Sequence, residues 1–346
     1  MNRKILLITD AWFPQINGVV TTLSNLVKQA KLNNDTIHVY HPGRCKIRFP
    51  LPFYPEIKVG IPNPFHIRKL LKKQKWDHIH IATPEGSLGI TFARTCRRLN
   101  IPFSTSCHTK FPEFINARFP FISVDTGWQW MKHVYRDSTH ILTTTESMKQ
   151  ELISHGFTQE IHSWSRGVDK DIFKPNLKHD INEIKTLLYV GRVSHEKNIE
   201  DFCKLDILNT KKIIVGDGPQ RKELEKRYSD VTFAGYKHGE ELASYYANAD
   251  VFVFPSKSDT FGVVILEAMA CGTPTAAYPV TGPVDIIRNG VNGYTREYLA
   301  DAVKNCLTID RQRVIIESEK WSWETCYNQF TKILLPIEEK QLTFDF

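Results

Sequence analysis

Short apolar runs alternate with segments of helical spacing along most of this chain. The apolar runs fall into two series, at residues 4–9, 36–41, 78–82, 103–107 and 140–144, and at 186–190, 212–215, 231–233, 251–254 and 275–278. Helical spacing appears between them, for example at residues 19–30, 65–74, 87–99, 239–248 and 262–269. Continuous apolar strands separated by helices indicate parallel sheets that are covered on both faces. The two series therefore predict two doubly wound α/β domains.

The boundary between the domains is predicted from the polar stretch at residues 174–185, which separates the two series. We place the first domain at residues 1–172 and the second at residues 173–318. The length of 346 residues suits two domains of about 150 residues each. Residues 319–346 are expected to form a helical segment, with Trp321 and Trp323, that packs back on the first domain.

The composition excludes several classes of protein. With 41% hydrophobic and 24% charged residues, the chain is not disordered, collagen-like or a coiled coil. No apolar run reaches the ~18 residues of a membrane span, and the first residues lead into a strand pattern rather than a signal peptide. The seven cysteines contain no CxxC pair, which indicates reduced thiols rather than a disulfide framework or a zinc site. We therefore expect a cytoplasmic protein.

The positive charge is concentrated in the first half of the chain. Residues 1–175 carry 24 Lys and Arg against 13 Asp and Glu, whereas residues 176–346 carry 21 against 25. Basic and aromatic residues are mixed in the segments 43–56, 65–76 and 110–121. Such segments suit an anionic bilayer surface, although a solvated helix face above core aromatics explains each of them singly. No nucleic-acid-binding module is present, so the membrane is the preferred partner.

A first candidate phosphate site follows the first apolar run. The segment 9–19 is a long loop that ends in Asn17 and Gly18 at a helix start, where backbone N–H groups and the helix dipole favour an anion. It matches neither GxGxxG nor a Walker loop, which argues against NAD and ATP. An ordinary helix N-cap explains the same residues.

A second candidate site follows the first apolar run of the second series. Gly191 is followed by two cations five residues apart, Arg192 and Lys197. Arg192 is able to bind a diphosphate with two N–H groups, and Lys197 to neutralise leaving-group charge. The alternative is a pair of surface ion pairs, for example between Lys197 and Glu200.

The most informative stretch is residues 256–274. Asp259 or Thr260 is predicted to cap a helix that starts near Phe261, and Gly262 allows a ligand to approach the backbone closely. From Gly262 onward this helix is apolar apart from Glu267, whose buried carboxylate requires hydrogen-bond donors. Vicinal sugar hydroxyls are such donors, and a nucleotide sugar has a diol at each end of a diphosphate. The alternative is a structural Glu paired with a core cation.

These motifs resemble those of the retaining GT-B glycosyltransferases of family 4. The resemblance rests on GRVSHEKN at 191–198, GDGP at 216–219 and DTFGVVILEAMACGTP at 259–274. The first-domain motifs, at 10–19, 106–112 and 164–169, together with AYPVTGP at 277–283, resemble the GDP-mannose-dependent α-mannosyltransferase branch, which acts on lipids. The resemblance covers nearly the full chain. It implies two Rossmann-like domains that face each other across a cleft.

The resemblance also implies roles for individual residues. It gives the nucleotide ribose to Glu267, the diphosphate to Arg192 and Lys197, and the hydroxyls of the transferred sugar to Asp259. Backbone N–H groups of the loop and helix start assist Asp259, namely those of Thr260, Phe261, Gly262 and Val263. Gly18 lets its loop approach the phosphate, and His108 faces the sugar near the reacting carbon, although His108 is equally well explained as a structural histidine. Many relatives have Glu in place of Asp259, which puts the identity of the sugar in doubt.

The implied mechanism needs no protein nucleophile. Front-face displacement, in which the leaving phosphate oxygen helps to deprotonate the acceptor hydroxyl, accounts for retention. The catalytic residues are then His108, Arg192, Lys197 and Asp259, with cations in the place of a metal ion. The sequence Asp-Lys-Asp at 169–171 matches a DxD metal motif, but we place it in a turn and assign no metal. The nucleotide sugar is a co-substrate, and no cofactor is expected.

The expected activity is transfer of α-mannose from GDP-mannose to a lipid or glycolipid acceptor, by a peripheral protein on the inner face of the cytoplasmic membrane. One alternative is a UDP-sugar-dependent transferase of polysaccharide or lipopolysaccharide biosynthesis. Another is a nucleotide-sugar epimerase on the same fold, which needs no acceptor. A non-catalytic nucleotide-sugar-binding subunit is a third, although the presence of Arg192, Lys197 and Glu267 argues against it.

Overall fold

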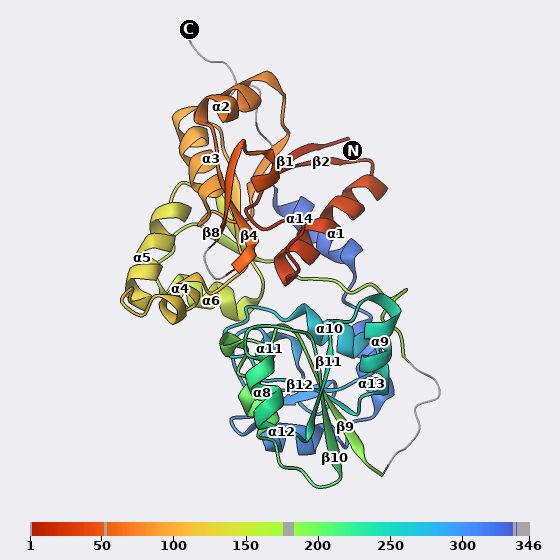
Figure 1. The fold of residues 1–346 in the computed structure, drawn as a ribbon. Coiled ribbons are helices and arrows are strands. Elements are labelled where there is room, and N and C mark those ends of the chain that lie inside the picture. Colours follow the sequence, from red (N-terminus) through yellow and green to blue (C-terminus); the bar gives the residue numbers. More distant parts are fainter. Residues whose placement is uncertain (1, 52–53, 176–182, 335–336, 338–346) are drawn as a thin grey trace. The chain divides into compact units, whose positions relative to one another are not determined.

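The computed structural model describes residues 2–51, 54–175, 183–334 and 337, which form two structural units (Figure 1). Unit 1 comprises Met1–Ser165 together with the chain from Trp323, and unit 2 comprises Arg166–Ser322. The predicted boundaries, after residues 172 and 318, lie within unit 2. The physical reason is packing, because Val168 is buried in the core of unit 2 and the ring of Trp321 lies 5.7 Å from that of Phe261.

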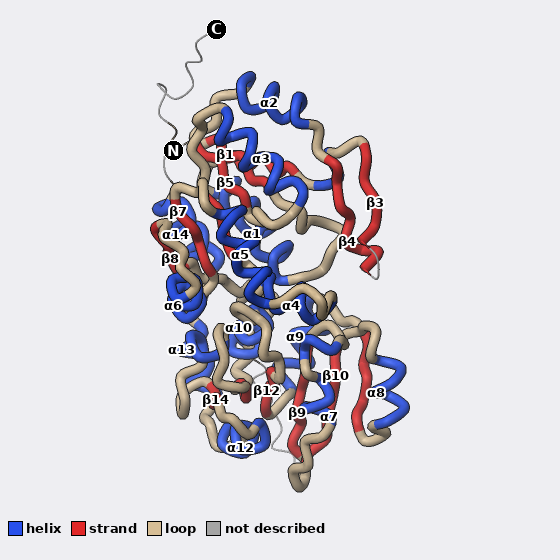
Figure 2. The backbone as a smooth tube through the Cα atoms, turned by 90° about the vertical axis from the view of Figure 1, so that its left-hand side faces the viewer, coloured by secondary structure: helices blue, strands red, loops and turns tan. Residues whose placement is uncertain are grey.

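Unit 1 contains a parallel sheet in the order β2-β1-β5-β6-β7-β8. Its strands are β1 (Lys4–Ile8), β2 (Thr36–Tyr40), β5 (His78–Ile81), β6 (Ser104–Cys107), β7 (His140–Thr143) and β8 (Glu160–Ser163). The helices of this unit are α1 (Gly18–Leu32), α2 (Pro64–Lys73), α3 (Ser87–Arg98), α4 (Phe111–Arg118), α5 (Val124–Tyr135), α6 (Glu146–Ser154) and α14 (Trp323–Ile333). An antiparallel pair, β3 (Ile47–Leu51) and β4 (Tyr54–Ile61), lies beside the main sheet, as Figure 2 shows.

The last helix, α14, belongs to unit 1. The indole N–H of Trp164 donates to the carbonyl of Cys326 at 2.9 Å, and the hydroxyl of Tyr327 donates to Asp35 at 2.6 Å. Phe330 is fully buried in the same cluster as Leu23 of α1. A buried aromatic face and two buried hydrogen bonds therefore fix α14 on this unit.

Unit 2 contains a second parallel sheet, in the order β11-β10-β9-β12-β13-β14. Its strands are β9 (Lys185–Val190), β10 (Thr210–Val215), β11 (Val231–Gly235), β12 (Val251–Phe254), β13 (Thr275–Ala277) and β14 (Gly293–Thr295). The helices are α7 (Ile199–Cys203), α8 (Arg221–Arg227), α9 (Gly239–Asn248), α10 (Val263–Ala270), α11 (Pro283–Ile286), α12 (Leu299–Cys306) and α13 (Arg311–Ser318). The two parallel α/β sheets confirm the predicted fold class.

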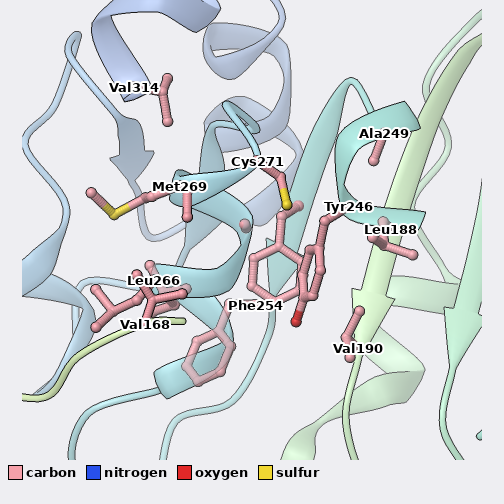
Figure 3. Packing of buried hydrophobic residues seen from close by; sticks show 14 of the residues in the cluster. Val168, Leu188, Val190, Tyr246, Ala249, Phe254, Leu266, Met269, Cys271 and Val314 are labelled. Carbon is pink, nitrogen blue, oxygen red and sulfur yellow. The ribbon is translucent and has the colours of Figure 1, made fainter. Parts of the chain in front are cut away.

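Helices cover both faces of the unit 2 sheet. On one face, α9 and α10 bury a cluster that includes Tyr246, Phe254 and Leu266 (Figure 3). On the other face, Phe202 and Val303 lie in a separate buried cluster. This double cover explains why a central strand such as β12 is buried at every position rather than at alternate positions.

The seven cysteines are buried as free thiols. Burial raises the pKa of several of them, Cys96 to about 12 for example. Among the described residues, no helix is both long enough and apolar enough to cross a membrane.

Candidate active site

The candidate donor site lies at the carboxyl edge of the unit 2 sheet. The chain runs from β9 outward to β10 and β11 and then crosses back to β12, on the other side of β9. Ligands of doubly wound sheets bind at such a reversal, outside the carboxyl ends of the two strands. The loops after Val190 and Phe254 start at this edge, and they carry the predicted residues.

Lys197 and Asp259 meet at this edge although they are far apart in sequence. Nζ of Lys197 lies 2.6 Å from Oδ1 of Asp259, and each side chain is 25% exposed. Lys197 ends the short 3-10 helix η2 (His195–Lys197), which the left-handed Asn198 terminates. The alternative of a surface ion pair between Lys197 and Glu200 is wrong, because Glu200 is paired with Lys204 at 3.1 Å. The position at the strand end, rather than closeness in sequence, decides the partner.

Arg192 lies at the same corner, directly after Gly191. It is half-buried, and its carbonyl oxygen accepts a hydrogen bond from the hydroxyl of Tyr189 at 2.8 Å. The loop after β10 approaches closely, because a Cβ on Gly216 would stand 1.9 Å from the carbonyl oxygen of Gly191. The GDGP motif therefore serves close packing of two strand-end loops at this corner.

The loop after β12 leads into α10 through a glycine. Gly262 has a φ of 93° and occupies the N-cap position, and no side chain caps the helix. The predicted capping by Asp259 or Thr260 is wrong, because the helix begins at Val263 and those two residues lie before the cap. Thr260 and Phe261 are buried, whereas Lys257 is exposed and Ser258 and Asp259 are partly exposed, so that Asp259 is the accessible acidic side chain of the loop.

Glu267 lies in the second turn of α10 and is half-buried. Its Oε2 accepts a hydrogen bond of 2.9 Å from the hydroxyl of Tyr246, on α9. Burial raises the pKa of Glu267 to about 7, against the lowering effect of the Tyr246 hydrogen bond. The core cation of the alternative explanation is not recorded among the described residues, where the partner of Glu267 is a phenol; a structural role for Glu267 stays compatible with this contact. Tyr246 was missed because nothing in the helical pattern of residues 239–248 distinguishes it.

The segment that leads into unit 2 packs against the same loop. Arg166 is 2% exposed, and its guanidinium carbon lies 5.8 Å from the centroid of the Phe261 ring. Asp169 accepts the backbone N–H of Asp171 at 3.1 Å, and Lys170 pairs with Glu319. The Asp-Lys-Asp sequence thus forms a local turn, as expected.

In unit 1, His108 follows the carboxyl end of β6. It is 9% exposed, and its Nε2 lies 2.8 Å from the hydroxyl of Ser106. The same hydroxyl lies 3.1 Å from Nε2 of His80, whose pKa burial lowers to about 3. His108 is therefore held by a buried network at a strand end, which is compatible with both the sugar-facing role and the structural role.

The loop after β1 ends in a capped helix. Oδ1 of Asn17 accepts the backbone N–H of Val20 at 3.0 Å, and the exposed Gly18 is the first residue of α1. The N-cap explanation of this motif is thus correct. It does not conflict with the phosphate role, because Gly18 is exposed beside the helix N-terminus.

Two carboxyl groups at the carboxyl edge of the unit 1 sheet were not selected by the sequence analysis as site residues. Asp10 accepts hydrogen bonds from Ser87 and from the backbone of Leu88, at the start of α3, and burial raises its pKa to about 6. Glu85 accepts a 2.5 Å hydrogen bond from Tyr135, and burial raises its pKa to about 7. Neither residue stands in an apolar run, which is the pattern that identified Glu267.

The basic segments of unit 1 separate into a surface and a core part. On α2 the basic side chains of Arg68, Lys69, Lys72 and Lys73 are exposed, whereas Ile67 and Leu71 are buried. The apolar members of this segment thus belong to the core. Phe65, 85% exposed at the start of α2, and Phe121, 85% exposed after α4, remain on the surface. Phe53, from the segment 43–56, lies outside the described residues.

The family of the chain follows from comparison with known proteins. The family model "Glycosyltransferase Family 4" matches residues 16–172, and "Glycosyl transferases group 1" matches residues 184–308. A GDP-mannose-dependent alpha-mannosyltransferase of Corynebacterium glutamicum is 31% identical over 316 residues, which cover 84% of this chain and 76% of that protein. A sulfoquinovosyl transferase of Arabidopsis thaliana is 30% identical over 93% of this chain and 71% of that protein.

Solved structures with the same fold extend over nearly the whole chain. A sucrose-phosphate synthase from Thermosynechococcus elongatus superimposes with a TM-score of 0.74 and 19% identity, over 96% of this chain and 98% of that one. Anabaena HepE, solved with UDP and glucose, gives 0.70 and 16% identity, over 96% of this chain and 99% of that one. These similarities show the GT-B fold. Together with the sequence matches, they establish that the chain belongs to glycosyltransferase family 4.

Proposed function

We propose that this glycosyltransferase transfers α-mannose from GDP-mannose, with retention, to a lipid or glycolipid acceptor at an anionic membrane surface. The observation that carries the donor part is the contact of Lys197 with Asp259 at the reversal of the sheet, with Glu267 in the helix that follows. This arrangement offers one cation and two carboxylates to a ligand that has a diphosphate and two sets of hydroxyls.

The ion pair between Lys197 and Asp259 joins the two charged groups that we assign to the sugar donor. Nζ of Lys197 and Oδ1 of Asp259 form an ion pair at 2.6 Å. A bound nucleotide sugar supplies phosphate oxygens to Lys197 and hydroxyl donors to Asp259, so each side chain exchanges one partner for another. Because both side chains are partly exposed, this exchange costs little desolvation.

Catalysis on this proposal is electrostatic. As the bond to the sugar breaks, negative charge grows on the diphosphate, and Lys197, Arg192 and the N-terminus of α10 stabilise it. The leaving phosphate oxygen then takes the proton of the acceptor hydroxyl. We propose no metal ion and no cofactor in this step, and chelating agents are expected to leave the rate unchanged.

The mannose and guanine assignments are supported by the names of relatives. Proteins of Corynebacterium glutamicum and Mycobacterium tuberculosis, 31% and 27% identical, are both GDP-mannose-dependent alpha-mannosyltransferases. The second candidate donor is a UDP-sugar. Glucose as the transferred sugar is supported by an alpha-monoglucosyldiacylglycerol synthase of Streptococcus pneumoniae, 26% identical over 80% of this chain, because its name gives a glucosylated lipid as the product.

The lipid acceptor and the location at the inner face of the cytoplasmic membrane are supported by the charge of unit 1. Exposed Lys69, Lys72 and Lys73 line α2. Each basic side chain near an anionic bilayer contributes ~1 kcal/mol of attraction. Exposed Phe65, at the start of the same helix, adds an apolar group beside this basic face.

The test is a transfer assay with purified protein, a membrane lipid extract, and either GDP-mannose or UDP-glucose as donor. Transfer of mannose only when lipid is present, with an α-linked product by NMR, supports the proposal. Transfer of glucose instead supports the second candidate. Conversion of the donor without lipid identifies an epimerase, and binding without turnover identifies a non-catalytic subunit; either result refutes the proposal. Asp259→Asn is the inactive reference variant. Lys204→Ala is the active reference variant, because Lys204 forms its ion pair outside the site.

A further inference from the structure

Tyr246 is a buried tyrosine whose hydroxyl forms a hydrogen bond with the carboxylate of Glu267. Its side chain is fully buried on α9, and its ring lies 5.5 Å from that of Phe252 and 5.9 Å from that of Phe173. Figure 3 shows the ring inside the apolar cluster, with its hydroxyl oxygen toward the level of Val190 and Phe254, the last residues of β9 and β12. The hydroxyl thus points to the carboxyl edge of the sheet, where the candidate donor site lies.

The hydroxyl of Tyr246 donates to Oε2 of Glu267 at 2.9 Å. Within the described part of the chain, the Tyr246 hydroxyl is the hydrogen-bond donor that the structure records for the Glu267 carboxylate. Burial and the nearby Glu267 raise the pKa of Tyr246 well above its usual value, so the phenol stays protonated and remains a donor. One oxygen of Glu267 is therefore occupied by the protein.

We propose that Tyr246 is a positioning residue for donor binding: its hydroxyl holds one oxygen of Glu267 so that the other accepts hydrogen bonds from the ribose hydroxyls. This inference rests on the ribose contact that the proposed function gives to Glu267. A carboxylate on a helix has several rotamers, and fixing one oxygen selects among them before the donor arrives. Glu267 then loses its rotamer entropy when the protein folds rather than when the sugar donor binds.

The same contact makes recognition of the ribose dependent on pH. Burial raises the pKa of Glu267 to about 7, and the Tyr246 hydrogen bond opposes this rise because it stabilises the charged form. Among the described residues, the thiol of Cys271, the C-cap residue of α10, also interacts electrostatically with Glu267, and Arg311 of α13 interacts with that thiol. No cation among the described residues is recorded as an ion-pair partner of Glu267 itself. Protonation turns an acceptor oxygen into a hydroxyl, so the ribose contact strengthens as the pH rises through this range.

The experiment compares two ligands that differ only in the ribose. The affinities of GDP and 2′,3′-dideoxy-GDP are measured by calorimetry at several pH values from about 6 to about 9. In this range a carboxyl group with a raised pKa changes its charge. The corresponding UDP pair is measured in parallel. Both members of a pair carry the same diphosphate, so the ratio of their affinities cancels phosphate ionisation and isolates the ribose contact.

In the unaltered protein, the ratio is expected to be about tenfold or more at the alkaline end and to fall toward acid pH, since hydrogen bonds to a charged group are stronger than those to a neutral one. Tyr246→Phe should lower the ratio toward 1 near neutral pH and move its rise to higher pH, because the Glu267 carboxylate loses the hydrogen bond from the phenol. A merely structural loss would weaken both ligands equally at every pH and leave the ratio unchanged, and that result overturns the inference.

Two variants separate this inference from the proposed function. Glu267→Ala should abolish the discrimination between the two ligands; if it does not, the ribose contact itself is wrong. If Glu267→Ala abolishes the discrimination but Tyr246→Phe retains it, only the positioning role is wrong. Tyr327→Phe is the matched control, because it removes a buried phenol hydrogen bond to Asp35 in unit 1 and should leave the ratio unchanged. The pH dependence of the unaltered protein is a further test that requires no variant, and a flat ratio overturns the inference.

Discussion

Replacing Lys197 by Ala tests the electrostatic mechanism most directly. Nζ of Lys197 is the cation in contact with Asp259, and its side chain is 25% exposed. At a partly exposed site with an effective dielectric constant of about 20, a unit charge about 4 Å from a phosphate oxygen contributes ~4 kcal/mol. Loss of one preorganised group of this kind typically lowers kcat about 100-fold to 1,000-fold. We therefore expect kcat of Lys197→Ala to fall by about that factor.

The expected loss is larger in kcat than in donor binding. The diphosphate is already charged in the bound donor, but its charge increases as the sugar leaves, so Lys197 stabilises the transition state more than the ground state. Folding should be little affected, because a partly exposed ion pair contributes at most about 1 kcal/mol. Steady-state kinetics with GDP-mannose and lipid, beside calorimetric titration with GDP, separates the two effects.

The matched control is Lys204→Ala, which removes a lysine that pairs with Glu200 outside the site. It should retain the kcat of the unaltered protein. An unchanged kcat for Lys197→Ala with a large rise in the donor KM would refute the reasoning, because it would mean that Lys197 binds the donor and its transition state equally.

Three further outcomes are expected. Glu267→Ala should weaken GDP binding by about tenfold or more, measured by calorimetry, because two hydrogen bonds to a carboxylate are lost; unchanged affinity would remove Glu267 from the ribose. Replacing Lys69, Lys72 and Lys73 by Gln should reduce binding to anionic vesicles by ~3 kcal/mol at low salt and by less at high salt, measured by sedimentation; equal binding would place the membrane surface elsewhere. Arg311→Met should lower the free energy of unfolding by ~3 kcal/mol, because its guanidinium donates to the carbonyls of Ala247, Ala249 and Cys271. Arg313→Met, exposed on the same helix, is the control in denaturant melts, and equal stability of the two variants would contradict the role of Arg311.

The clearest core strands were predictable because they contain consecutive apolar residues, as in VFVF of β12 and LLYV of β9. The run at 251–254, for example, coincides with β12, and the run at 186–190 differs from β9 by one residue. The edge strands β8 and β14 escaped prediction, since they are short and partly polar and therefore lack an apolar run. The antiparallel pair β3 and β4 escaped for a similar reason, because basic residues interrupt its apolar ones.

The site was predictable to the extent that it depends on strand ends. The rule that ligands bind at the carboxyl ends of parallel strands selected Arg192, Lys197 and Asp259, and the structure brings Lys197 and Asp259 into contact. Predictions from local sequence failed where tertiary packing determines the start of a helix or the partner of a side chain. The helix after Asp259 begins at Val263 rather than near Phe261, because the left-handed Gly262 turns the chain between the loop and the helix. The bond between Tyr246 and Glu267 joins two helices, and no spacing in the sequence encodes it.

The two carboxylates of the donor site differ in a way that fits their proposed tasks. Asp259 is paired with a cation and partly exposed, whereas Glu267 is paired with a phenol, and burial raises its pKa to about 7. On the proposed function, Asp259 has to release Lys197 when the diphosphate arrives. When the nucleoside diphosphate leaves after transfer, Asp259 is able to pair with Lys197 again, which lowers the cost of separating a more highly charged product from the cation. On the proposed function, Glu267 exchanges no partner, since its second oxygen gains the ribose while the first keeps Tyr246. The proposal therefore gives the donor a fixed contact at its nucleoside end and an exchangeable one at its reacting end, and a site that binds a sugar donor and then releases its diphosphate requires both.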